Sequence, residues 1–247
     1  MAKTYLITGA TSDVGRALMT RLLAKFEEGD RIIAQGSGDL AKLRELCMAN
    51  PGRIFPYDVD LTSEQAIGAF VDDIKGNHPV PTHIVHLPAL RAINTKFKNY
   101  DEDRFALDMN VQVNSAVQLC KAMLPKMAKA KFGRVLFIET SYIIGIPPKN
   151  MTAYVMAKSA LHGLMKSLAV EYASFGITVN SVAPSMMETA FLAETPDLIV
   201  QAAAEANPMK RNARVEDVVP AMEFLLGDEA GFITGVTLPV TGGSAIA

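Results

Sequence analysis

Residues 141–158 contain three side chains whose types and spacing can do chemistry on a carbonyl group. Tyr154 and Lys158 are four residues apart, which places them on one face of a helix, and Ser141 precedes the tyrosine by thirteen residues. A phenol that exchanges protons near neutral pH needs a pKa below its usual value of about 10, and an ammonium group one helical turn away lowers it by favouring the phenolate. A serine hydroxyl can hold a carbonyl oxygen beside the phenol. These residues predict a site that reduces a carbonyl or oxidises an alcohol, although the tyrosine–lysine spacing alone also fits an ordinary exposed pair.

The beginning of the chain predicts the strand–turn–helix unit that binds a dinucleotide. A buried strand at Lys3–Gly9 leads through a turn of small residues into a helix at Arg16–Glu28. Gly9 would form the turn, and Gly15 would let the start of the helix pack closely. Backbone amides at the positive end of this helix would face a pyrophosphate group. These amides belong to Thr11, Ser12, Asp13, Val14 and Gly15.

Two positions near this unit bear on the choice of dinucleotide. Asp13 stands where such loops usually carry a glycine, and its carboxylate is unfavourable beside phosphates unless it turns away or caps the helix. The second strand, Arg31–Gln35, ends without the acidic residue that would bind the ribose diol of NAD. Ser37 can hydrogen-bond a 2′-phosphate and would not repel it. We therefore expect NADP(H) to be preferred, with NAD(H) as the alternative.

The remaining elements alternate between short apolar strands and helices. This alternation predicts an α/β fold: a single-domain, Rossmann-type, doubly wound parallel sheet with helices on both faces, spanning residues 1–247. Residues 186–207 form a longer excursion over the strand ends and are expected to be a substrate lid. The further strands are expected at 53–57, 82–87, 134–139, 177–182 and 236–240, and the further helices at 40–49, 63–74, 101–127, 152–172, 196–206 and 216–226.

Composition and charge exclude several classes of protein. The chain has 247 residues, 49% of them hydrophobic, and a net charge of −2, which argues against a nucleic-acid binder. Cys47 and Cys120 provide neither a disulfide framework nor metal-ligand spacing, and His83 with His86 lacks a third ligand nearby, so we expect no metal. No apolar run reaches the length of about 18 residues needed to span a membrane, and no leader precedes the first strand. We expect a cytoplasmic protein.

Taken together, these motifs resemble the short-chain dehydrogenase/reductase family over essentially the whole chain. Thr8-Gly9 and Gly15 match the glycine-rich loop of the family, and Ser141, Tyr154 and Lys158 match its catalytic set. Other matches are the pair Asp58-Val59, the active-site asparagine Asn110, and Val182-Ala183-Pro184 with Thr189. The tail from residue 208 onward looks most like the 3-oxoacyl-acyl-carrier-protein reductase branch, which acts in fatty acid biosynthesis.

The resemblance implies further roles. Asn110 would anchor a water that relays protons to Lys158. The family's NNAG segment reads His86-Leu87-Pro88-Ala89 here, so the backbone near the adenine ribose would take another path. Beyond the glycine-rich loop and Ser37, the residues expected to bind the cofactor are Asp58, Val59, His86, Pro88, Tyr154, Lys158, Pro184, Met187 and Thr189.

The catalytic hydroxyl has two candidates. Counting forward from Gly133-Arg134 gives Thr140, whereas counting back from Tyr154 gives Ser141. Adjacent residues of a strand point to opposite faces, so only one of them can serve. We expect Ser141, because serine and tyrosine must meet across one substrate.

The expected reaction interconverts a ketone and a secondary alcohol, with a hydrophobic ketone or a β-ketoacyl group, possibly on an acyl carrier protein, as substrate. The basic residues between Lys121 and Arg134 would either steer such an acidic carrier or complement a helix end. By resemblance we expect a homotetramer or homodimer paired through the helices at 101–127 and 152–172. Two alternatives stay open: an NAD-linked dehydrogenase of a small hydrophobic alcohol, and a non-catalytic regulator or scaffold on the same fold.

Overall fold

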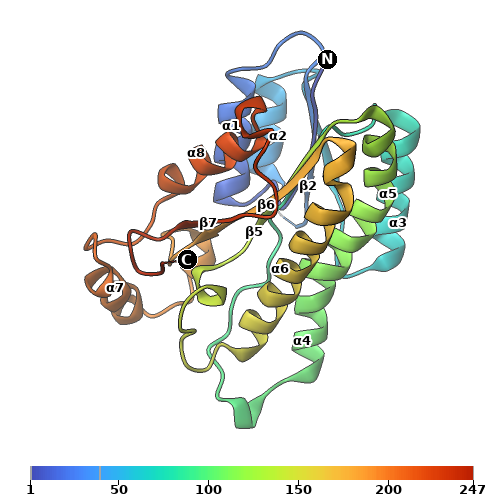
Figure 1. Ribbon diagram of the computed structural model, residues 1–247. Coiled ribbons are helices and arrows are strands. Elements are labelled where there is room, and N and C mark those ends of the chain that lie inside the picture. Colours follow the sequence, from blue (N-terminus) through green and yellow to red (C-terminus); the bar gives the residue numbers. More distant parts are fainter. Residues whose placement is uncertain (1, 39, 247) are drawn as a thin grey trace.

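Seven parallel strands form the centre of the molecule in a computed structural model, which describes residues 2–38 and 40–246 (Figure 1). Their order across the sheet is β3-β2-β1-β4-β5-β6-β7. Because the order reverses between β1 and β4, the carboxyl ends of those strands border a crevice at one edge of the sheet. The strands are β1 (Thr4–Thr8), β2 (Arg31–Gly36), β3 (Ile54–Asp58), β4 (His83–His86), β5 (Gly133–Ile138), β6 (Ile177–Pro184) and β7 (Thr237–Val240). The predicted doubly wound parallel sheet is confirmed.

Helices cover both faces of the sheet (Figure 1). One face carries α1 (Asp13–Leu23), α2 (Ala41–Ala49) and α8 (Val215–Leu226); the other carries α3 (Glu64–Asn77), α4 (Glu102–Met109), α5 (Ser115–Ala130) and α6 (Thr152–Tyr172). Alternate residues of a strand supply the two cores. In β5, for example, Val135 and Phe137 pack with α5 and α6, whereas Leu136 packs with α8.

The helix expected at 101–127 is divided in two. Between α4 and α5 the chain makes one π-helical turn at Asn110–Asn114. Inside it the Ser115 hydroxyl donates to the carbonyl of Val111 at 2.6 Å. Turns of this kind commonly mark functional sites, and this one begins at the asparagine that the sequence analysis singled out.

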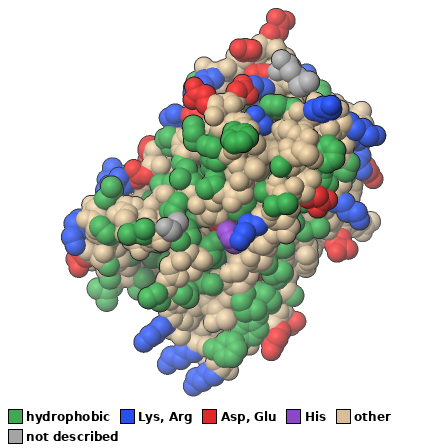
Figure 2. All heavy atoms as spheres, viewed as in Figure 1, with side chains coloured by type: hydrophobic (Ala, Val, Ile, Leu, Met, Phe, Trp, Pro, Cys, Tyr) green, Lys and Arg blue, Asp and Glu red, His purple; other side chains and the backbone are tan. Residues whose placement is uncertain are grey.

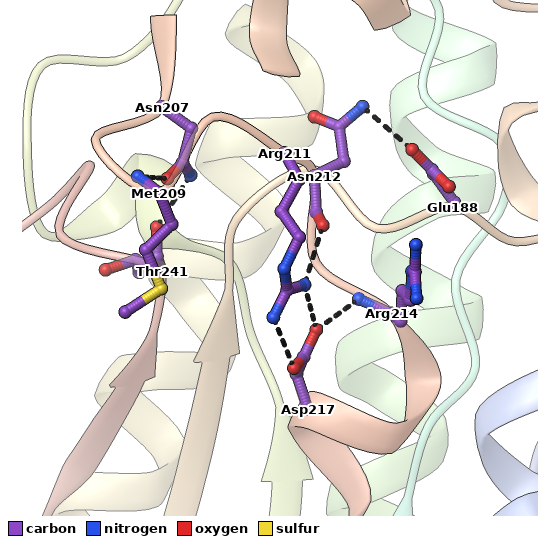
Figure 3. Close-up of polar contacts among 8 residues, drawn as sticks. All are labelled: Glu188, Asn207, Met209, Arg211, Asn212, Arg214, Asp217 and Thr241. Atoms are coloured by element: carbon purple, nitrogen blue, oxygen red, sulfur yellow. Dashed lines mark hydrogen bonds and ion pairs between the residues drawn. The ribbon is translucent and has the colours of Figure 1, made fainter. Parts of the chain in front are cut away.

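The segment from 186 to 214 crosses the carboxyl edge of the sheet and contains α7 (Asp197–Ala206). Figure 3 shows how polar contacts anchor it to the rest of the chain. The Asn207 amide donates to the Thr241 carbonyl and accepts from the Met209 N–H, each at 2.9 Å. Arg211 donates to both carboxylate oxygens of Asp217, at 2.5 and 2.8 Å. The segment is thereby joined to the C-terminal tail and to the start of α8.

Two further observations concern what the described residues lack. None of their helices is long and apolar enough to cross a membrane. Across residues 2–38 and 40–246, no group of three or more His, Cys, Asp or Glu side chains is arranged to hold a metal ion.

Candidate active site

Tyr154 and Lys158 lie one turn apart on α6, above the carboxyl end of β5. The Lys158 side chain is 1% exposed, and its ammonium donates to the carbonyl of Ile138 at 2.8 Å. The same ammonium lies 5.9 Å from the centre of the Tyr154 ring. Burial lowers the pKa of Lys158 to about 8, although attraction by Glu139 and Asp108 opposes this shift. The site therefore contains a desolvated cation beside a phenol.

The hydroxyl that meets the phenol belongs to Thr140. Its side chain hydrogen-bonds Tyr154, and its oxygen also receives the Tyr142 N–H at 3.4 Å. Ser141 opens a 3₁₀ turn, Ser141–Ile143, and lines a neighbouring cavity instead. The expectation of Ser141 at the phenol is thus corrected in favour of the count from Gly133. The thirteen-residue count misled because the chain turns into the 3₁₀ helix at Ser141, whereas Thr140 keeps the extended backbone that follows β5.

The pKa of Tyr154 moves in the direction opposite to the one we expected. Burial raises it above the usual value for a phenol, and the hydrogen bond to Thr140 offsets only part of that rise. Tyr142, which packs edge-on against Tyr154 with ring centres 6.5 Å apart, adds a smaller upward contribution. The phenol is accordingly protonated at neutral pH, the state that a proton donor needs.

Asn110 lies at the first residue of the π-helical turn, which packs against α6. Its side-chain oxygen accepts a hydrogen bond from the Asn114 amide at 2.7 Å. The structure therefore brings this turn to the helix that carries Tyr154 and Lys158.

His86 is part of the core rather than of a cofactor surface. It is 1% exposed; its Nδ1 lies 2.8 Å from the Thr8 hydroxyl and its Nε2 lies 3.0 Å from the carbonyl of Gln112 in the π-helical turn. Burial, followed by repulsion from Lys158, lowers the pKa of His86 to about 3, so the ring is neutral. The expectation of direct cofactor binding by His86 is corrected, because the ring links β1 to the turn that begins at Asn110.

The glycine-rich loop has the geometry that close approach to a pyrophosphate requires. Gly9 adopts a φ of +69°, and a side chain there would come within 3.1 Å of the Pro88 backbone. A Cβ on Gly15 would lie 2.7 Å from the Gly9 carbonyl. Ser12 caps α1 by accepting the Gly15 N–H at 3.0 Å. The loop thus holds the positive end of α1 against β1, the arrangement in which phosphates bind.

Asp13 turns away from the loop and binds the lid segment. One carboxylate oxygen pairs with Arg16 at 2.5 Å, and the other accepts the Ala190 N–H at 2.8 Å. The next residue, Val14, is buried in the core behind the loop. The negative charge of Asp13 is therefore paired with Arg16, and its carboxylate joins α1 to the loop after β6.

The end of β2 carries no carboxylate among the residues the structure describes, which omit Asp39. The Gln35 side chain points inward, accepting the Gly9 N–H at 3.0 Å and donating to the Val59 carbonyl at 2.7 Å. Ser37 is exposed, and Asp58 is exposed at the end of β3. A Cβ at Gly36 would approach the Thr11 methyl group to 2.4 Å, so glycine is required there. Ser37 thus directly follows β2, Asp58 ends the neighbouring strand β3, and the Val59 N–H donates to the Gly36 carbonyl at 3.0 Å.

A cavity of about 410 Å³ lies between the loop after β5, the lid segment and the C-terminal tail, and it is lined by Tyr142, whose ring packs edge-on against Tyr154. Residues that line it include Ser141, Tyr142, Ile146, Met186, Asn207 and Ala245. Pro184 ends β6, and Met187 forms a bridge with Ala213 while accepting a hydrogen bond from Thr189 at 3.5 Å. The expected nicotinamide loop therefore borders both the cavity and Asp13.

Comparison with known proteins agrees with this geometry. A family model described as enoyl-(acyl carrier protein) reductase matches residues 9–245. The chain belongs to the short-chain dehydrogenase/reductase family and is an oxidoreductase.

Among curated relatives, the chain is 30% identical over 243 residues to the 3-oxoacyl-[acyl-carrier-protein] reductase FabG of Pseudomonas aeruginosa, covering 98% of this chain and 96% of that protein. It is 29% identical over 248 residues to the acetoacetyl-CoA reductase of Allochromatium vinosum, covering 98% of each. Among solved structures, an NAD⁺-bound xylitol dehydrogenase superposes with a TM-score of 0.88 at 26% identity, covering 98% of each chain.

Sequence reasoning missed two residues beside Lys158. Glu139 directly follows β5, and His162 follows Lys158 by one helical turn. The signal that could have revealed Glu139 is a charged residue directly after a buried strand. The spacing of His162 had no meaning until β5 and α6 were seen to face each other.

Proposed function

We propose that this protein reduces a ketone to a secondary alcohol with NADPH, acting on β-ketoacyl substrates. The observation that carries the proposal is a protonated phenol, Tyr154, hydrogen-bonded to Thr140 and one turn from the buried cation of Lys158. A phenol that is protonated near neutral pH is in the state that a proton donor to a reduced carbonyl needs. The relationship to β-ketoacyl reductases supports the same direction.

In the proposed mechanism, Thr140 and Tyr154 hydrogen-bond the substrate carbonyl oxygen from two sides, as an oxyanion-type donor pair. Tyr154 then gives its proton to that oxygen. Lys158 stabilises the phenolate that is left, and the turn at Asn110 would hold a water through which the proton is replaced. Bound NADPH supplies the hydride that reaches the carbonyl carbon.

The cofactor would be held by residues that fit it. The positive end of α1 would take the pyrophosphate, Pro184 and Thr189 would border the nicotinamide, and Ser37 would face the 2′-phosphate. A titration with NADPH and NADH, followed by fluorescence, tests the preference. Tighter NADPH binding that Ser37→Asp reverses would support it, and tighter NADH binding by the native protein would overturn it.

The polar lining of the cavity favours one alternative. Ser141, Ser244 and Asn207 line it beside the apolar Ile146 and Met186, and hydroxyl and amide groups also suit the diol of a sugar alcohol. NAD-linked oxidation of a polyol is therefore the second candidate. Assays with a β-ketoester plus NADPH and with a polyol plus NAD⁺ separate the two, because only the first should turn over appreciably.

The basic run that the sequence analysis singled out lies away from Tyr154. The basic residues between Lys121 and Lys131 end α5 at the amino edge of the sheet, opposite Tyr154, and Arg134 is buried with its guanidinium over the Phe132 ring. Within one chain this run is not at the site mouth, which corrects the expected steering patch. Figure 2 instead shows Lys and Arg side chains along the lower edge of the molecule, and exposed Lys96 and Lys98 precede α4.

Self-association is supported by apolar side chains that α4 to α6 leave exposed. Examples are Leu107, Val117, Met156 and Val170, with Val170 84% exposed. We propose that these helices pair copies of the chain into a dimer or tetramer. Light scattering after size exclusion would test this, since a mass of 26.6 kDa would mean a monomer and would overturn it.

A direct test of the function follows NADPH oxidation with ethyl acetoacetate as a small β-ketoester. Turnover by the native protein that Tyr154→Phe abolishes would support the proposal. No turnover with any β-ketoester, by a protein that still binds NADPH, would overturn it.

A further inference from the structure

Glu139 is a carboxylate buried beneath α6, directly after the last residue of β5. The residue is 2% exposed. Its Oε2 lies 3.2 Å from His162 Nδ1 and accepts from the Thr237 hydroxyl at 3.2 Å. Its Oε1 is buried and has no hydrogen-bond partner in the part of the chain that the structure describes. Burying a charged group this deeply is unfavourable unless opposite charge lies close by.

Two basic side chains of α6 lie near this carboxylate: His162, which contacts it, and the active-site lysine, which is attracted by its charge. Lys158 and His162 are one turn apart on α6, and the carbonyl that accepts from Lys158 belongs to Ile138, the residue before Glu139. Glu139 faces α6, because it continues the alternation of Val135 and Phe137, which pack on that side. The carboxylate therefore sits under the two side chains, on the side of the sheet where the lysine is buried.

The other titratable groups around Lys158 either attract its ammonium more weakly than Glu139 does or carry no charge near pH 7. Attraction by Glu139 is the largest influence that opposes the lowering of the Lys158 pKa by burial, and Asp108 of α4 is the next. His86 of β4 is neutral near pH 7, because its pKa is lowered to about 3. Tyr154, on α6 itself, is protonated. Glu139 is thus the principal negative charge facing Lys158.

We propose that Glu139 is a positioning residue whose carboxylate keeps Lys158 protonated at and above neutral pH, with His162 and Thr237 holding that carboxylate in place. The proposal rests on the proposed function, in which the ammonium stabilises the Tyr154 phenolate. Without Glu139, burial would dominate and the lysine would lose its charge within the working pH range. The site would then lose the cation that the proton transfer needs.

Glu139→Gln tests this, since it keeps the shape and the contact with Thr237 but removes the charge. The pKa of Lys158 should fall, so the alkaline limb of kcat against pH should move down by about one pH unit, the size of a nearby charge effect. At pH 6, where the lysine stays charged, activity should remain within about threefold of native; near pH 8 it should fall about fivefold, and at pH 9 and above about tenfold. Glu139→Asp should keep the limb near its native position.

A purely structural role would lower activity equally at every pH and leave the limb in place, and that result would overturn the proposal. Glu171→Gln, at an exposed position of the same helix, is the matched control and should change neither quantity.

A second measurement does not need catalysis. Because the folded pKa of Lys158 is below its unfolded value of about 10.4, the unfolded state binds more protons between them, and the free energy of unfolding rises with pH in that window. In Glu139→Gln the rise should begin about one pH unit lower. If this shift is seen in a protein that reduces no ketone, the proposed function is contradicted but the effect of Glu139 on Lys158 is supported. If the dependence of the free energy of unfolding on pH is the same in both proteins, the inference is contradicted.

Discussion

Charged side chains are buried to different depths at the two ends of the sheet. At the carboxyl end, Lys158 and Glu139 are almost fully buried, and one oxygen of Glu139 has no hydrogen-bond partner among the described residues. At the amino end, Arg21 and Lys25 pair with Glu223 at 2.6 and 2.5 Å while remaining largely exposed themselves. The amino end nevertheless has the larger cavity, about 590 Å³ against 410 Å³.

This difference teaches that cavity size alone does not locate the chemistry. Exposed ion pairs contribute at most about 1 kcal/mol each and are an ordinary feature of protein surfaces. Desolvated and incompletely paired charge costs stability, so it is expected where the charge has a task. The account therefore predicts large kinetic effects at the carboxyl end and small, purely structural effects at the amino end.

The largest effect is expected at the phenol. Tyr154→Phe removes the proton donor and leaves the ring packed against Tyr142, so kcat should fall by at least about 10²-fold, the scale of a positioned general acid. Nucleotide affinity, measured by fluorescence, should stay nearly native. Near-native turnover would show that the buried phenol is only structural and would erase the contrast between the two ends.

The next effect separates neighbouring hydroxyls. Thr140→Val keeps the shape of the side chain but removes the hydrogen bond to Tyr154, and should lower kcat by about tenfold or more. Ser141→Ala removes a group that lines the cavity and should act mainly on KM. Steady-state kinetics of both variants show which hydroxyl acts beside Tyr154. A greater loss of kcat in Ser141→Ala than in Thr140→Val would mean that Ser141 is the catalytic hydroxyl.

A smaller effect is expected at Asp13. Its carboxylate binds the Ala190 N–H and lies in the first turn of α1, where phosphates would bring like charge. Asp13→Asn should tighten NADPH binding a few-fold, with the gain shrinking as salt screens the repulsion. Calorimetry at two salt concentrations measures both quantities. Weaker binding by the variant at low salt would mean that the carboxylate helps to build the cofactor site.

The smallest kinetic effect is expected at the amino end. Although burial raises the pKa of Glu223, hydrogen bonds from Lys25 and Arg21 lower it on balance. Glu223→Gln should reduce the free energy of unfolding by about 1 kcal/mol at pH 7. The loss should disappear as the pH falls through the lowered pKa of Glu223, because the native carboxylate is then itself protonated. Urea unfolding measures the loss, and a changed kcat would contradict the assignment of chemistry to the other end.

The fold was predictable because alternating apolar strands and helices leave few arrangements for a parallel sheet. Tyr154 and Lys158 were predictable because they lie four apart on one helix. Thr140 was misassigned because the chain changes direction where β5 gives way to the 3₁₀ turn at Ser141. No local spacing reveals that Glu139, which follows β5, His162 of α6 and Thr237 of β7 meet. His86 was misread for the same reason, since its partners, Thr8 and the Gln112 carbonyl, come from distant parts of the chain.

The central claim is that the carboxyl-end site transfers a hydride from NADPH to a ketone, with Tyr154 as the proton donor. The most direct measurement supplies NADPH deuterated at either face of C4, together with ethyl acetoacetate, and analyses the alcohol by mass spectrometry. The account predicts one deuterium on the carbinol carbon from one of the two labelled cofactors with the native protein, and almost no labelled product with Tyr154→Phe. Alcohol without deuterium from either cofactor, or equal labelled product from both proteins, would contradict it.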